Sequence, residues 1–470
     1  MSFKKEVIIS GVWVFSLRTI QLFFSLASLI IISRFLTPKD IGTFGVVLLI
    51  LSILEVFSGI GFEQAIIQKR FHKRKYCDTA WTIRIFRGFI ISFILLTTAP
   101  FIADFFKLPQ IILILRVICL TILFQNCSNI NVILLQKELK FKQYFIYNSI
   151  SLIIEGLITI SGIIIFRNVW ALVFGNIAGN FFKCIISFFI IKEKPRIYFN
   201  TAHAKQLFNF GRWVLWSNAL TFLAIQFDSF FIGKVMGPIS LGFYGLAGRI
   251  ANLPVTEIGN VIGQVTFPAY SKLQKDISKM KAAYLKTLNF ISFIACPVTC
   301  LIVILSHSFV ILFLGERWLS TVPLIKILSI AAVLRCLAGT AAKVFYALGF
   351  PRLETKIQLL RLIILLLFIY PLSYKWGTNG IALAVLISVF LTAGMFFIIL
   401  SKIIKTNLMD FINAIKWPLL NTFFMVILTY PLSSKYGNNV IGFIKTLLTG
   451  IIVYISMFLL HKKWVNKKTA

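Results

Sequence analysis

The stretch SRFLTPKDIG, Ser33–Gly42, recurs two hundred positions later as GKVMGPISLG, Gly233–Gly242. Proline fixes φ for a tight turn, and glycine lets a helix begin close to a neighbouring helix. Two similar turns can arise by chance, but they indicate an internal repeat if both occupy the same place in a fold. The matched positions carry a basic residue, a proline, two glycines and an aromatic residue: Arg34 and Lys234, Pro38 and Pro238, Gly42 and Gly242, Gly45 and Gly245, and Phe44 and Tyr244.

The composition is that of a membrane protein. Of the 470 residues, 59% are hydrophobic and 13% are charged, and the mean hydropathy is +0.90. Soluble domains have roughly 45–50% apolar and about 25% charged residues. Apolar runs of the ~20 residues needed to span a bilayer recur from end to end. We therefore predict an all-α polytopic membrane protein, with a first apolar run too long for a signal peptide and so retained as a helix.

Positive charge is distributed unevenly between the two sides of the predicted membrane. An even number of spans, fourteen, puts both termini on one side. That side carries 29 of the 48 Lys and Arg residues, and the opposite side carries 8, which places both termini in the cytoplasm. Topology and attraction to anionic lipids therefore explain most of the net charge of +33 without a nucleic-acid partner. The predicted spans are 10–33, 41–62, 81–103, 110–132, 144–166, 170–191, 209–233, 241–263, 285–306, 322–347, 357–374, 378–400, 416–432 and 441–460.

The two copies of the opening turn lie six spans apart, at the outer ends of the first and seventh helices. Equal orientation of the copies is the signature of a parallel repeat. We predict one six-helix lobe over residues 1–200 and a second over 201–402. A second echo, YPLSYKWGTNG at 370–380 and YPLSSKYGNNV at 430–440, indicates that residues 403–470 add a further hairpin and a cytoplasmic tail outside the twofold core.

Basic residues within the spans share helical faces with small or polar residues. Ionisable residues at membrane depth usually face the interior of the bundle or a hydrated cavity. Such faces are also how membrane helices pack, so a packing or ion-pair role is the alternative for each residue. Because the faces occur in both lobes, we predict a cationic, substrate-binding cavity. Its candidate residues are Arg18, Arg249, Arg335 and Lys183, with Arg116, Arg84 and Arg87 nearer the membrane ends, where they can snorkel.

Three buried acids, Asp228, Glu155 and Glu55, could pair with these basic residues or carry a coupling H⁺ or Na⁺. Nothing points to an enzyme: the chain has no phosphate-binding loop of the Walker type, and its four histidines fall in loops or at membrane ends. The seven cysteines have no metal-ligand spacing with a histidine. We expect no catalytic residues, no metal site and no cofactor other than a coupling ion.

Several motifs resemble one family in the same order along the chain. They are SRFLTPKDIGTFGV, TAPFIADFF, LQKELKFKQYF, VWALVFGNIAG, FDSFFIGKVMGPISLGFYGLAGRI, FLGERWLSTVPLIKILSI and ALGFPRLETKI. They are similar to the Wzx-type lipid-linked oligosaccharide flippases, the polysaccharide transporters of the MOP (multidrug/oligosaccharidyl-lipid/polysaccharide) superfamily. Asp228 matches a recurrent acid of that family, whereas the sequence around Arg18 does not match closely.

The resemblance implies a V-shaped pair of six-helix lobes that work by alternating access in the bacterial inner membrane. Such proteins translocate undecaprenyl-diphosphate-linked repeat units for O-antigen, lipopolysaccharide, capsule or exopolysaccharide. The implied partners are this glycan, the lipid bilayer and polysaccharide polymerase or assembly proteins. Two alternatives stay open: a multidrug/cation antiporter of the same superfamily, for which an acidic cavity is expected, and a membrane glycan polymerase or ligase, for which a large outer loop is expected.

Overall fold

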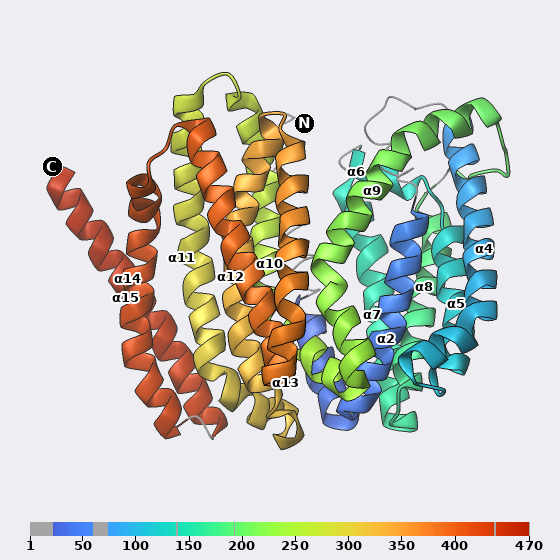
Figure 1. Ribbon diagram of the computed structural model, residues 1–470, viewed down its shortest axis with the longest axis horizontal. Coiled ribbons are helices and arrows are strands. Elements are labelled where there is room, and N and C mark those ends of the chain that lie inside the picture. Colours follow the sequence, from blue (N-terminus) through green and yellow to red (C-terminus); the bar gives the residue numbers. More distant parts are fainter. Residues whose placement is uncertain (1–21, 60–73, 138–139, 192, 437–438, 470) are drawn as a thin grey trace. The chain divides into compact units, whose positions relative to one another are not determined.

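The computed structural model describes residues 22–59, 74–137, 140–191, 193–436 and 439–469 (Figure 1). Every regular element within these ranges is a helix, which confirms the predicted all-α fold. In the same ranges, 10 helices are long and apolar enough to cross a membrane, judged by length and composition. The predicted total of fourteen stays a prediction. One segment, Pro351–Ile404, contains two predicted spans, and another, Asn218–Asn252, overlaps parts of two. Two further apolar helices, Leu22–Phe35 and Ile111–Cys127, are shorter.

The chain divides into two compact units, of which the first is Met1–Gly242. In this unit α7 packs along α8, α4 packs on α5, and α9 packs on α2 and α4. The predicted lobe boundary at 200/201, which rests on the repeat, stays a prediction. The helices are α2 (Pro38–Ser58), α4 (Arg74–Phe106), α5 (Ile111–Cys127), α6 (Val132–Lys137), α7 (Phe141–Phe166), α8 (Trp170–Ile190), α9 (Thr201–Phe231) and the π-helical turn η1 (Ile232–Met236).

The second unit is Phe243–Ala470. Here α12 packs on α13, and α11 packs on α12, α14 and α15. The two predicted spans 357–374 and 378–400 both fall in α13, where Trp376 and Gly377 have non-helical backbone between them. The elements are α10 (Gly237–Leu273), which begins in the first unit, α11 (Ile277–Phe309), η2 (Val310–Leu314), η3 (Glu316–Trp318), α12 (Thr321–Ala347), α13 (Pro351–Ile404), α14 (Leu408–Tyr436) and α15 (Val440–Thr469).

The opening turn forms as its sequence dictates. Thr37 caps α2: its hydroxyl accepts from the backbone N–H of Asp40, and the Asp40 carboxylate accepts from the Thr37 N–H. This reciprocal capping box satisfies two amides at the helix start, and Pro38 stands at the first helical position, where a missing N–H costs nothing. In the second copy, Gly237 ends η1 with φ of 84°, a left-handed conformation that favours glycine.

The two copies of the turn pack against each other. A Cβ added to Gly42 would fall on the carbonyl oxygen of Pro238, and one added to Gly242 would fall on the carbonyl oxygen of Pro38. The contact is reciprocal, as a local twofold relation between two copies of one motif requires. Both copies lie in the first unit, so the repeated glycines are contact positions that admit no side chain.

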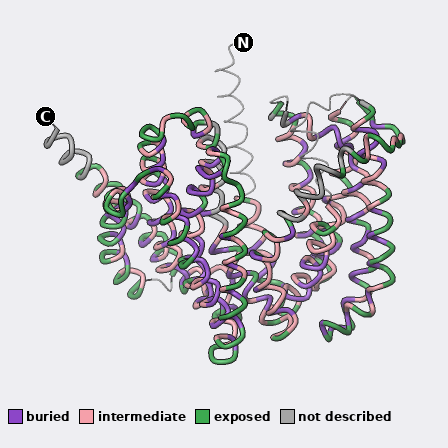
Figure 2. Tube along the Cα trace, turned by 45° about the horizontal axis from the view of Figure 1, so that its top comes forward, coloured by how far each residue is buried: buried purple, intermediate pink, exposed green. Residues whose placement is uncertain are grey.

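The outer surface of the helices is apolar. Figure 2 shows exposed and buried positions alternating along the helices, so each helix turns one side to its neighbours. Large apolar side chains such as Phe101, Phe189 and Tyr374 are 74%, 84% and 89% exposed. Soluble monomers rarely expose contiguous apolar surface of this kind. Its exposure along membrane-length helices is that of a multi-pass membrane protein.

Candidate functional site

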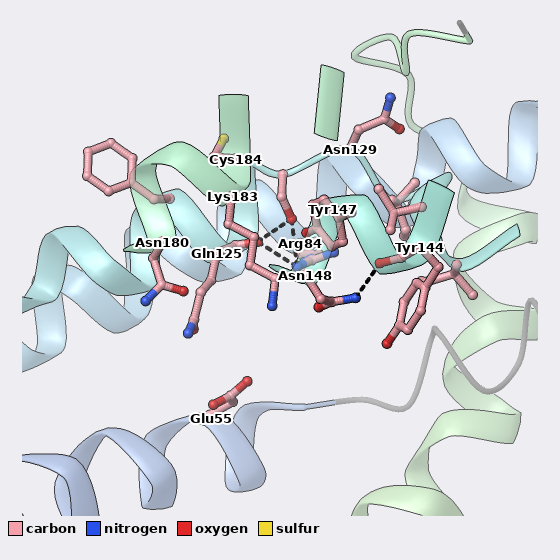
Figure 3. A pocket seen from close by; sticks show the side chains of 15 residues that line it. Glu55, Arg84, Gln125, Asn129, Tyr144, Tyr147, Asn148, Asn180, Lys183 and Cys184 are labelled. Carbon is pink, nitrogen blue, oxygen red and sulfur yellow. Dashed lines mark hydrogen bonds between the residues drawn. The ribbon is translucent and has the colours of Figure 1, made fainter. Parts of the chain in front are cut away.

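A polar cavity of about 230 Å³ lies within the first unit, among α2, α4, α5, α6, α7 and α8. Figure 3 shows Arg84, Lys183, Tyr147 and Asn148 gathered on one side of it. Glu55 points toward this group from α2 on the other side. The cavity therefore brings together three predicted residues, Arg84, Lys183 and Glu55. Its other polar lining comes from Gln125, Ser128, Asn129, Tyr144, Tyr147, Asn148, Asn180 and Cys184.

One wall of the cavity is a break between α5 and α6. Helix α5 ends at Cys127, and Ser128 follows with extended ψ of 149°, so the predicted span 110–132 is wrong at its C-terminal end. Ser187 on α8 accepts a hydrogen bond from the Asn129 N–H at 2.8 Å. Asn129 in turn donates to the Glu193 carbonyl at 3.0 Å. Irregular backbone at membrane depth is tolerated where it is bonded to protein or lines a cavity, and here both conditions hold.

Arg84 is bound to this helix end. Its Nη2 atom donates to the Gln125 carbonyl at 2.5 Å and to the Ser128 hydroxyl at 3.1 Å. The indole N–H of Trp81, one turn earlier on α4, donates to the Ser128 carbonyl at 3.1 Å. The last carbonyls of a helix have no partner within the helix. Arg84 therefore holds the α5 terminus in place and also supplies positive charge to the cavity wall.

Lys183 projects from α8 beside the phenol ring of Tyr147. Its Nζ atom lies 5.4 Å from the ring centroid, within the range of a cation–π interaction. Its neighbour one turn earlier, Asn180, also lines the cavity. The predicted polar face of this helix thus does point into a cavity toward its C-terminal end.

Toward the middle of α7 and α8 the same faces serve packing instead. A Cβ added to Gly175 would overlap the Thr159 hydroxyl and lie 3.0 Å from the Thr159 Cβ. A Cβ added to Gly179 would lie 2.7 Å from the Cβ of Glu155. Glycine on one helix therefore accommodates a polar side chain on the other. Glu155 lies at this helix contact, outside the residues that line the cavity.

The remaining predicted residues of the first unit lie elsewhere. Arg87 donates to the Asn126 side chain at 2.7 Å and to the Ser58 carbonyl at 3.2 Å, which ties α4 to α5 and to the end of α2. Arg116 is exposed on α5 and lies outside the cavity lining. Asp228 is buried near the end of α9, and its carboxylate accepts from the Ser229 N–H at 2.6 Å. Arg18 lies outside the described residues.

In the second unit, two predicted faces meet. Arg335 on α12 donates to the Asn252 side chain on α10 at 2.8 Å. Asn252 lies three residues after Arg249 and so shares its helical face, and the Arg249 side chain itself is exposed. Further along, a Cβ added to Gly259 would lie 3.1 Å from the Cys336 sulfur. This arrangement matches the first unit, in which basic residues and closely packed glycines share one face.

Three features of the structure escaped prediction. Gln125, Ser128 and Asn129 line the cavity because α5 breaks there, and the only signal was the polar run SNIN at 128–131 within an apolar stretch. Tyr144 and Tyr147 on α7 also line the cavity, and no sequence signal singled them out. Arg361, counted among the cytoplasmic charges, is only 7% exposed on α13. Its position three turns into an apolar helix was the signal for burial.

Comparison with known proteins shows which family this chain is similar to. Residues 31–323, more than half of the chain, match the family described as "Polysaccharide biosynthesis protein". Teichuronic acid biosynthesis protein TuaB of Bacillus subtilis (strain 168) is 24% identical over 385 residues, 81% of this chain and 79% of that protein. Lipopolysaccharide biosynthesis protein WzxC of Escherichia coli (strain K12) is 19% identical over 435 residues, 92% of this chain and 88% of that protein.

A solved structure has the same fold. Lipid II flippase MurJ in an inward closed conformation superposes with a TM-score of 0.79, covering 97% of this chain and 99% of that chain at 15% identity. At this level of identity the likeness concerns the fold alone, and it confirms the predicted architecture class. With the family match over residues 31–323, the resemblance inferred from the sequence motifs is confirmed: the chain belongs to the polysaccharide biosynthesis protein family.

Proposed function

We propose that this protein flips undecaprenyl-diphosphate-linked oligosaccharide repeat units from the cytoplasmic to the outer leaflet of a bacterial inner membrane. The repeat units would serve O-antigen, capsule or exopolysaccharide synthesis. The family membership and the names of the relatives TuaB and WzxC support a role in polysaccharide export. In this proposal no bond is made or broken, so the protein is a transporter and not an enzyme. Both termini lie in the cytoplasm, and polymerase or assembly proteins receive the exported units.

The observation that carries the proposal is the polar cavity of the first unit. It combines two cationic side chains, Arg84 and Lys183, with amide and phenol side chains inside a membrane-embedded helical unit. Cationic groups hold phosphate strongly where water is scarce. Amides and phenols both donate and accept hydrogen bonds, which suits the hydroxyl groups of a sugar.

The two cations have different tasks in this proposal. Arg84 is already bonded to Gln125 and Ser128, so it positions the wall and adds charge. Lys183, beside the Tyr147 ring, is a compact point charge on a flexible stem with three donors, so it can contact the diphosphate as well as its protein neighbours. The amides of Asn148 and Asn180 would contact the first sugars.

The other predicted residues enter as parts of the same proposal. Arg335, with Asn252, and Arg249 would extend the cationic surface in the second unit. Arg18 would do the same from the first helix. Asp228, Glu155 and Glu55 are candidates for binding a coupling H⁺ or Na⁺. Glu55 is the one of these that faces the cavity.

The cavity chemistry also bears on the antiporter alternative. A site for cationic drugs is expected to be acidic and aromatic. Among the described residues that line this cavity there is one carboxylate, Glu55, against two cations. We therefore prefer an anionic substrate. Drug susceptibility of a deletion strain tests the alternative directly.

The test is charge removal at Lys183. Lys183→Gln keeps a polar side chain of similar length but removes the charge. A hydrogen bond to a charged group contributes about 1.5–3 kcal/mol, and each 1.4 kcal/mol is tenfold in affinity. Complementation of a strain lacking its own flippase should fall at least tenfold in surface glycan at equal protein level. Lys107→Gln, which alters an exposed lysine, is the matched control. Equal export by Lys183→Gln and the wild type would refute the cavity assignment.

A further inference from the structure

A second cavity, of about 830 Å³, lies in the second unit between α14 and the C-terminal part of α13. We call it the α14 groove. Its lining is apolar except for one lysine. The residues that matter here are Phe397 on α13 and Leu408, Ile412, Lys416, Leu419 and Phe423 on α14. The groove is separate from the polar cavity of the first unit, which shares none of these residues.

The groove follows a single face of α14. Positions 408, 412, 416, 419 and 423 recur every three or four residues, which places them along one side of a helix. At 1.5 Å per residue, the face from 408 to 423 is about 22 Å long. One leaflet of a bilayer contributes about half of its ~30 Å hydrocarbon core. The part of the α14 groove from Lys416 to Phe423 is about 10 Å long at 1.5 Å per residue, so it can hold the upper part of one acyl chain with Lys416 at the head-group end.

The groove is preformed because the other side of α14 is fixed to α11. Lys281 on α11 forms a salt bridge with Asp410 at 2.6 Å. Asn289 donates to the Ala414 carbonyl at 2.6 Å. The ring of Phe411, which lines the groove, packs edge-on against Tyr284 of α11, with centroids 6.0 Å apart. These contacts hold α14 in place, so a ligand in the groove would not have to order the helix.

Charge defines which lipid suits the groove. Lys416 is exposed, and its Nζ atom lies 5.8 Å from the ring centroid of the adjacent Trp417. Lysine and tryptophan are the usual anchors at a membrane interface. Asp410 does not oppose this charge, because its carboxylate is bridged to Lys281. Basic pockets between membrane helices bind anionic head groups.

We propose that the α14 groove binds an anionic glycerophospholipid of the bilayer. One acyl chain lies along Leu419 and Phe423, and the lipid phosphate contacts Lys416. Helical side chains point toward the N-terminus of the helix, which directs the Lys416 ammonium to the end of α14 that is predicted to be cytoplasmic. This site is independent of the proposed transport function, since its ligand is a resident lipid and not the cargo.

Native mass spectrometry of the full-length protein tests the proposal. Phosphatidylglycerol and phosphatidylcholine with identical acyl chains are added at equal concentration. We expect phosphatidylglycerol to bind more strongly, and Lys416→Gln to weaken that binding about fivefold, the effect of one lysine near an anionic membrane surface. Lys402→Gln, an exposed lysine near the end of α13, should leave it unchanged. Equal binding of the two lipids, or equal loss in both variants, would overturn the assignment.

A crosslinking experiment identifies the occupant in cells. A photoreactive benzoylphenylalanine in place of Leu420, which also lines the groove, should capture an anionic phospholipid. Capture of a polyprenyl chain instead would show that the groove belongs to the substrate and would overturn the proposal. Neither experiment depends on flippase activity, so failure here leaves the proposed function standing.

Discussion

Gly42 and Gly242, two hundred residues apart, meet at one contact. A Cβ on Gly42 would lie 2.9 Å from the Gly242 amide nitrogen, and a Cβ on Gly242 would lie 3.1 Å from the Gly42 amide nitrogen. The two copies of the turn therefore form the two sides of one contact. Its repetition follows from this geometry, because each copy needs the other to lack a side chain.

Alanine at either glycine should destabilise the protein. Overpacking a close contact typically costs about 1–3 kcal/mol, and here the added methyl meets backbone atoms that cannot rotate away. We expect Gly42→Ala and Gly242→Ala each to lower the stability of the purified protein in detergent. Because the two sites share one contact, the double variant should lose less than the sum. Thermal unfolding of the wild type, the two single variants and the double variant measures this non-additivity.

Gly245→Ala is the matched control for that cycle. Gly245 belongs to the same repeat, but a Cβ there would meet no heavy atom within 4 Å in the described part of the chain. The Gly245→Ala variant should be at least as stable as the wild type, because alanine favours a helix more than glycine does. Strictly additive losses from Gly42→Ala and Gly242→Ala would contradict a shared contact.

Arg84→Gln should destabilise the first unit as well as lower transport. It removes charged hydrogen bonds to Gln125 and Ser128, each worth about 1.5–3 kcal/mol. Arg84→Lys should not restore both bonds, because the lysine side chain ends one bond short of the Nη2 atom that makes them. Thermal unfolding should rank the wild type above both variants. Arg116→Gln, at an exposed arginine of α5, should unfold like the wild type. Equal losses of thermal stability from Arg84→Gln and Arg116→Gln would contradict a specific role of Arg84 at the end of α5.

Gly175→Ala should weaken the α7–α8 contact, and a second change should partly restore it. The added methyl would overlap the Thr159 hydroxyl, so Thr159→Ala removes the overlapping atom. The Thr159 Cβ, 3.0 Å away, would remain close, which limits the rescue. The expression level and the thermal unfolding of the two single variants and the double variant measure both the loss of stability and its rescue. A double variant less stable than Gly175→Ala alone would rule out this packing geometry.

Cys184 reports on the polar cavity, which it lines. In a variant that keeps Cys184 as its single cysteine, a small hydrophilic thiosulfonate reagent should label the thiol in membrane vesicles. A variant that keeps only Cys296, which is 7% exposed in the second unit, should label far more slowly. Equal labelling of the two would mean that the cavity is closed to water. Prior reaction at Cys184 should also slow export, because the adduct occupies the site.

The fold could be predicted from the sequence because the features that specify it are periodic or repeated. The turn around Pro38 and its copy at Pro238, and the stripes of glycine and polar residues on α7 and α8, follow from local geometry. The stripes also predicted that Lys183 faces inward. They could not separate the cavity-lining end, at Lys183, from the packed middle, at Thr159, because both have the same residue spacing.

The break in the helix after Cys127 could not be predicted from local sequence patterns. It depends on partners distant in the chain: Trp81 and Arg84 on α4, and Ser187 on α8. The polar run SNIN at 128–131 weakens the helix propensity there, but it does not show where the helix ends. The break forms because side chains from other helices bond the freed backbone groups, which are costly to leave unpaired in a membrane.

The central claim, that the cationic cavity carries a lipid-linked glycan across the membrane, is tested most directly by reconstitution. The purified protein is placed in liposomes with a fluorescent polyprenyl-diphosphate oligosaccharide, and its movement between leaflets is followed with an impermeant quencher. The proposal predicts that the wild type and Lys107→Gln flip the lipid, while Lys183→Gln does so at least tenfold more slowly. Flipping no faster than in empty liposomes, or equal rates for Lys183→Gln and the wild type, would contradict it.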